Sequence, residues 1–144
     1  MKNFLKLAAL LGLVVTLVTG CANRATAIVD PSTDLAGIKT MYVKKVPEDG
    51  RGIDLLIADK LRSKGVKVTT GTEAPVSNVD AVVTYVDKWF WDITMYMLEL
   101  TITIREPKTD FPLATGNSFH TSLTRLSPKE MVNEVIDNIY KGGR

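Results

Sequence analysis

The chain has few of the residues that support metal, redox or disulfide chemistry. Its 144 residues include one cysteine, Cys21, and one histidine, His120. A single cysteine excludes an internal disulfide and a cysteine-rich zinc site, and a single histidine excludes a multi-histidine metal centre. We therefore expect no metal and no cofactor. The length favours one folded domain over a two-domain enzyme.

Beyond the N-terminal segment, the chain also lacks an excess of positive or negative side chains. The chain has 18 Lys and Arg against 16 Asp and Glu. Residues 1–20 hold two of these lysines, Lys2 and Lys6, and no acidic residue, so the remainder has 16 basic and 16 acidic side chains. No basic block replaces the two lysines, and nucleic acid is therefore not expected as a partner.

The N-terminus has the pattern of an export signal. Two lysines precede an apolar run, Leu7–Val18, that is shorter than the roughly 20 residues needed to span a bilayer as a helix. The run ends in Leu17-Val18-Thr19-Gly20-Cys21, where small residues precede the cysteine. An ordinary secretory signal with an incidental cysteine, or an uncleaved anchor, are the alternatives.

This ending resembles the lipobox of bacterial lipoproteins. The resemblance implies that the Cys21 thiol carries a diacylglyceryl group, that residues 1–20 are a signal peptide removed before Cys21, and that the new amino group is acylated, for example with palmitate. Ala22, rather than Asp, implies sorting to the outer membrane with the body facing the periplasm; surface display is the alternative. Several acyl chains anchor a protein durably, whereas one does so marginally.

The rest of the chain predicts a lipidated tether over residues 21–36 and one α+β domain over 37–141. The tether is small, polar and without sustained periodicity. Helices are predicted between Ile53 and Gly65, where apolar residues follow helical spacing, and after Ser127, which begins a capping box. We expect strands over residues 38–46, 66–70, 79–88, 95–105 and 113–123. This order predicts a single mixed sheet of about five strands with two helices on one face.

Alternation in the segment 95–105 predicts which side chains face the core. The residues expected to point inward are Tyr96, Leu98, Leu100, Ile102 and Ile104. Met95 and Met97 then lie on the opposite face, where they form an adaptable docking surface. The alternative is that the faces are inverted and the two methionines lie beneath a helix.

Three consecutive aromatic residues, Trp89, Phe90 and Trp91, occur where one strand should turn into the next. Successive strand residues point to opposite faces, so all three rings cannot enter one core. One interpretation is an anchor for a protein partner or for the membrane interface, where tryptophan is favoured. The other is an aromatic clamp that closes the end of the domain.

Candidate catalytic groups are few. His120 has no neighbouring nucleophile motif, so a solvated or sheet-packed histidine is favoured over a general base. Asp87 and Asp92 would act as paired carboxylates only if the hairpin brought them together. The backbone of Gly50-Arg51-Gly52 could bind an anion, but it lacks the Lys-Ser/Thr of a phosphate loop and a plain turn is favoured.

The element order after the lipobox is similar to that of small accessory lipoproteins of the Gram-negative envelope, which implies a non-catalytic role. We therefore predict a lipid-anchored periplasmic interaction or accessory module with an envelope protein as partner. Its contact residues would be Trp89, Phe90, Trp91, Met95 and Met97. The alternative is a small envelope hydrolase or ligand-binding enzyme that uses Asp87, Asp92 or His120.

Overall fold

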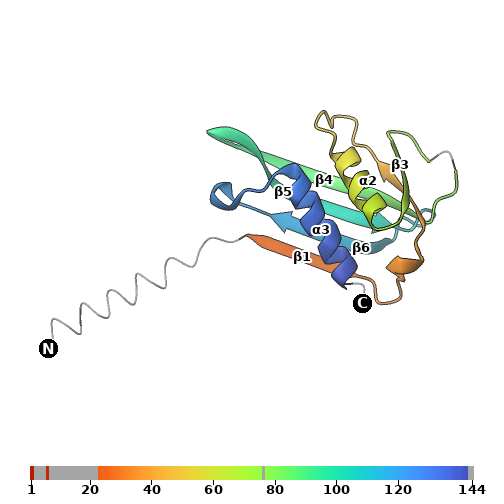
Figure 1. Ribbon diagram of the computed structural model, residues 1–144, viewed down its shortest axis with the longest axis horizontal. Coiled ribbons are helices and arrows are strands. Elements are labelled where there is room, and N and C mark those ends of the chain that lie inside the picture. The colour runs from red at the N-terminus through yellow and green to blue at the C-terminus, as the bar shows by residue number, and fades with distance from the viewer. Residues whose placement is uncertain (2–5, 7–22, 76, 143–144) are drawn as a thin grey trace.

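The computed structural model describes residues 1, 6, 23–75 and 77–142 (Figure 1). The predicted lipidation site, Cys21, and nearly all of the predicted signal lie outside the described residues. Within the described ranges, no helix is long and apolar enough to cross a bilayer.

The described body contains six strands, two α-helices and two short 3-10 helices. The strands are β1 (Arg24–Val29), β2 (Thr40–Lys44), β3 (Lys67–Gly71), β4 (Ala81–Asp92), β5 (Thr94–Arg105) and β6 (Pro112–Phe119). The α-helices are α2 (Ile53–Ser63) and α3 (Pro128–Gly142), and the 3-10 helices are η1 (Leu35–Gly37) and η2 (Ser122–Thr124).

The strands form one mixed sheet in the order β1-β6-β5-β4-β2-β3. β2 runs parallel to β3 and β4, whereas the β4-β5, β5-β6 and β6-β1 pairs are antiparallel. Both α-helices cover the same face of the sheet (Figure 1). The predicted α+β class, the mixed sheet and the two helices on one face are therefore confirmed.

The predicted strand count was one too low, because the expected tether contains β1. Residues 24–29 pair with β6, from Arg24 opposite Phe119 to Val29 opposite Ala114. Ala27 and Val29 pack against the core, but the inward-facing side chains are small, so alternation was weak in the sequence. The sheet therefore begins at Arg24, only three positions after Cys21.

The core lies between the sheet and the helices. Gly116 of β6 shows how closely α3 approaches, because a Cβ there would lie 2.8 Å from Val135 Cγ1 and 2.9 Å from Ile139 Cγ1. The predicted capping box begins α3 as expected: the Glu130 amide donates to Ser127 Oγ (3.3 Å) and the Ser127 amide donates to Glu130 Oε2 (2.8 Å).

A β-bulge in the β4-β5 pair reverses the predicted faces at one end of β5. Lys88 pairs with Glu99 but Trp89 pairs with Met97, so Leu98 is the extra residue. Leu100, Ile102 and Ile104 face the core as predicted. Before the bulge, Met97 takes the core position and is 1% exposed, whereas Leu98 and Tyr96 lie outside the core cluster. The predicted inward position of Leu98 was therefore wrong. Tyr96 is buried as predicted (7% exposed), but its ring lies against Arg125 and Phe90 instead of the core cluster.

Candidate functional site

The β4-β5 hairpin extends beyond the rest of the sheet (Figure 1). The last row of residues that crosses four strands consists of Lys88, Glu99, Phe119 and Arg24. Past this row, residues 89–92 and 94–97 pair only with each other. The hairpin therefore projects as a two-stranded ribbon, which twists strongly and needs contacts with the rest of the domain to be stable.

The end of this ribbon exposes four large apolar side chains. Phe90 is 53% exposed, Trp91 66%, Ile93 85% and Met95 50%. We call these four residues the hairpin tip. Trp91 pairs with Met95, Phe90 pairs with Tyr96, and Ile93 forms the turn. Such a cluster of exposed apolar side chains marks an interaction site more often than isolated exposed residues do.

The base of the hairpin is held in place by cation-π contacts on both strands. The Arg51 guanidinium lies 3.9 Å from the centroid of the Trp89 ring, and the Trp89 indole N–H donates to Asp87. The Arg125 guanidinium lies 4.7 Å from the Tyr96 ring and donates to Thr94 Oγ1 (2.7 Å). These contacts anchor the ribbon to the loops that precede α2 and α3.

Ile93 has a backbone conformation that β-branched residues rarely adopt. Its φ of 63° lies in the left-handed region, where the branched side chain collides with its own backbone. Asp110, the other non-glycine residue with positive φ in the described chain, is of a type that tolerates this region. A strained and almost fully exposed isoleucine points to a role for its side chain other than packing.

The structure separates the five predicted contact residues. Phe90, Trp91 and Met95 are exposed at the tip, but Trp89 packs against the core and Met97 lies within it. Trp89 therefore closes the end of the domain, as the clamp interpretation expects, while Trp91 faces outward and is free to act as the anchor that the other interpretation predicts. Ile93 was missed; its position between the two strand patterns was the available signal. Partner binding by these residues stays a prediction.

His120 is buried and fully engaged rather than poised for catalysis. It is 4% exposed; its Nδ1 contacts the Thr124 carbonyl oxygen and its Nε2 contacts Glu134 Oε2, each at 2.9 Å. Ser118 Oγ donates to the same carboxylate oxygen. This cluster joins β6, η2 and α3 and leaves His120 no free face for a substrate.

The two aspartates of the alternative enzyme hypothesis do not converge with His120. Asp87 and Asp92 stand five residues apart on one strand, about 16 Å along its axis. Asp87 is separated from Ser118 by Leu100, which is fully buried between them in the same row. Among the described residues, none of these three groups hydrogen-bonds another, and no cluster of three metal-binding side chains occurs.

In the turn before α2, backbone amides already bind the carboxylate of Asp49. The Asp49 carboxylate accepts hydrogen bonds from the amides of Arg51 (2.8 Å), Ile53 (2.8 Å) and Asp54 (3.3 Å) and from the Tyr85 hydroxyl (2.7 Å). Burial alone would raise the pKa of Asp49, but these hydrogen bonds outweigh it and hold the pKa below its usual range. The amides that an external anion would need are therefore occupied.

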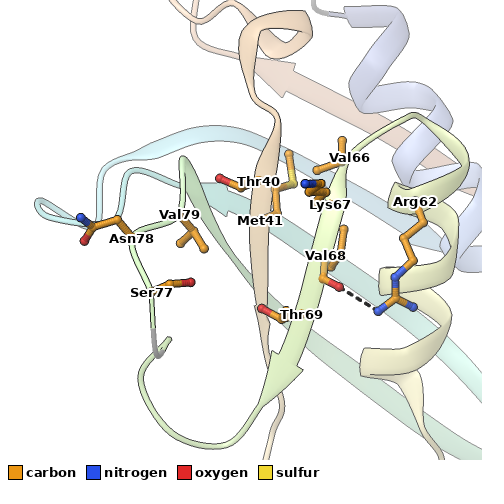
Figure 2. Close-up of a pocket in the computed structure, with 10 residues that line it drawn as sticks. All are labelled: Thr40, Met41, Arg62, Val66, Lys67, Val68, Thr69, Ser77, Asn78 and Val79. Atoms are coloured by element: carbon orange, nitrogen blue, oxygen red, sulfur yellow. Dashed lines mark hydrogen bonds between the residues drawn. The ribbon is translucent and has the colours of Figure 1, made fainter.

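A shallow cavity of about 470 Å³ lies at the opposite end of the sheet, where β2 and β3 begin (Figure 2). Thr40, Lys67 and Asn78 contribute polar groups to its wall. Its one arginine, Arg62, turns toward the Val68 carbonyl oxygen (2.8 Å) and also contacts Asp59 (2.8 Å). The cavity therefore offers no convergent set of catalytic groups.

Comparisons with known proteins identify the fold but no family. No protein-family model matches the chain, and no curated protein sequence matches it. Two structures of the PelC dodecamer from Paraburkholderia phytofirmans are similar, with TM-scores of 0.60 and 0.59 at 13% and 14% identity. They cover 82% of this chain and 98% and 97% of PelC.

A PDZ domain protein from Parabacteroides distasonis gives a TM-score of 0.53 at 12% identity. That match covers 81% of this chain and 35% of the other. At these identities the likeness establishes the shared fold alone.

Proposed function

We propose that the protein is a lipid-anchored, non-catalytic interaction or accessory module of the bacterial outer membrane, facing the periplasm. The hairpin tip carries this proposal, because it exposes four apolar side chains on a rigid base while the candidate catalytic groups lie apart. The lipobox-like ending at Cys21 supports the anchor. The fold shared with PelC is compatible with an assembly role, and the dodecamers of PelC make association of several copies one arrangement to test.

The anchor is tested by labelling cells with a palmitate analogue. Wild-type protein should incorporate the label and fractionate with the outer membrane, whereas Cys21→Ser should incorporate none and lose membrane association. Thr16→Ser, a conservative change within the apolar run, is the matched control and should behave as wild type. An unlabelled wild-type protein with a free Cys21 thiol would refute the anchor.

The contact surface is tested by placing a photo-reactive amino acid at position 91 in intact cells. The proposal expects cross-links from position 91 to an envelope component, whether protein or lipid. Position 86 is the control, because Val86 is also exposed (59%) on β4 but lies within the sheet. Equal cross-linking from the two positions would remove the hairpin tip from the proposal.

A further inference from the structure

We propose that the hairpin tip is seated in the interfacial region of the same bilayer that holds the Cys21 lipid. This inference rests on the proposed function and names the partner of its contact surface: lipid rather than protein. Three observations support it: the hairpin tip and the start of β1 lie at the same end of the sheet, apolar side chains surround the ribbon, and polar groups limit how deeply the tip can insert.

The hairpin tip and the start of β1 lie at the same end of the sheet. Arg24, the first residue of β1, shares the last four-stranded row with Lys88, and the hairpin continues past this row on the side where β1 begins (Figure 1). Ile93 lies five residues beyond Lys88, about 17 Å along the ribbon. Cys21 lies three residues before Arg24, at most about 10 Å. A lipid on Cys21 thus brings the bilayer within reach of the tip.

The apolar groups surround the ribbon instead of forming one flat surface. Trp91 and Met95 form a cross-strand pair on one face, Phe90 projects from the other, and Ile93 occupies the turn. A protein surface that docks against one face would leave Phe90 or Trp91 in water. Immersion in lipid covers both faces and the turn together, so the distribution favours a bilayer.

Polar groups limit the depth of insertion. Asp92 stands beside Ile93 and is partly exposed, and a carboxylate in the hydrocarbon centre is costly. The exposed Arg51 lies against Trp89 at the base of the ribbon, where its guanidinium can bind lipid phosphates. Arg125 adds a second positive charge beside Tyr96, although its guanidinium already donates to Ser122 and Thr94. Tryptophan itself favours the headgroup level. The tip is therefore interfacial, with Trp91 near the headgroups and the ring of Trp89 above the membrane.

The chain contains two tryptophans, which makes each ring a separate reporter. Protein expressed from the full chain is recovered from membranes and reconstituted into phosphatidylcholine vesicles with brominated acyl chains, which quench nearby indoles. Trp89→Phe leaves Trp91 as the reporter, and Trp91→Phe leaves Trp89 as the matched control. We expect a larger loss of emission for Trp91 than for Trp89, and a shift of Trp91 emission to shorter wavelength than in the urea-unfolded protein.

Equal quenching of the two reporters would overturn the inference. Protection of Trp91 from both the brominated lipid and aqueous acrylamide would also overturn it, because the ring would then be covered by protein, such as a second copy. Ile93→Asp in the Trp89→Phe background should lower the quenching, since aspartate tolerates the backbone conformation but opposes insertion. Mass analysis of the same samples separates the two proposals: lipidated protein without quenching refutes the tip contact alone, whereas unlipidated protein refutes the anchor.

Discussion

Replacing Ile93 by asparagine should stabilise the fold, although it removes a large apolar side chain. An L-residue in the left-handed region costs about 1–2 kcal/mol, and asparagine visits that region at less cost. Ile93 is 85% exposed at φ 63°, so little buried apolar area is lost. The expected net gain is about 1 kcal/mol, which for a body of this size raises the melting temperature by roughly 4 °C.

Urea unfolding of the purified protein followed by far-ultraviolet circular dichroism measures this gain as a higher midpoint at unchanged slope. Ile93→Val is the control, because valine keeps the β-branch and should bring no gain. A midpoint for Ile93→Asn at or below that of wild type would show that the turn is not strained, and the backbone of Ile93 would then give no reason to assign its exposed side chain a role.

Three other changes test the structure away from the tip. Gly116→Ala should destabilise the fold by about 1–3 kcal/mol because its Cβ meets α3, whereas Gly50→Ala, with nothing within 4 Å, should leave the urea midpoint nearly unchanged. His120→Ala should cost about 1–3 kcal/mol by leaving Glu134 and a backbone carbonyl without their partner; a wild-type midpoint would contradict a structural role. Asp49 makes stability depend on pH: its folded-state pKa is lowered, so its contribution is present above the unfolded value of about 3.9 and is lost as the pH falls through the folded value. Asp49→Asn should remove that part of the acid dependence, and identical urea midpoints for both proteins across that window would contradict it.

The parts of the fold that followed from the sequence are those with strong periodicity or capping chemistry. The α2 and α3 patterns, the capping box at Ser127 and the alternation over Leu100–Ile104 each predicted what the structure shows. β1 was missed because alanines make up most of its inward-facing side, and its outward side carries Ile28, which is 77% exposed. Pairing with β6 makes this segment a strand, and the local sequence of residues 24–29 carries no signal of that pairing.

The candidate site was only partly predictable, because its geometry depends on one extra residue. The run of aromatics correctly located an unusual hairpin. Which rings are free depends on the bulge at Leu98, which places Met97 in the core opposite Trp89 and leaves Met95 at the tip. Period-two patterning cannot locate a bulge, since one inserted residue reverses every face beyond it. The sequence shows that Ile93 lies between two strand patterns, but its left-handed backbone conformation is a property of the turn geometry.

A membrane contact at the hairpin tip would orient the whole body. β4 runs from Ala81 to Asp92, about 36 Å, and its far end borders the cavity lined by Thr40 and Asn78. If the hairpin tip and Cys21 are both held at the bilayer, one end of the sheet is attached twice, and the strands extend from the membrane surface into the aqueous space. The cavity, the start of β3 and the loop before β4 then face the aqueous space.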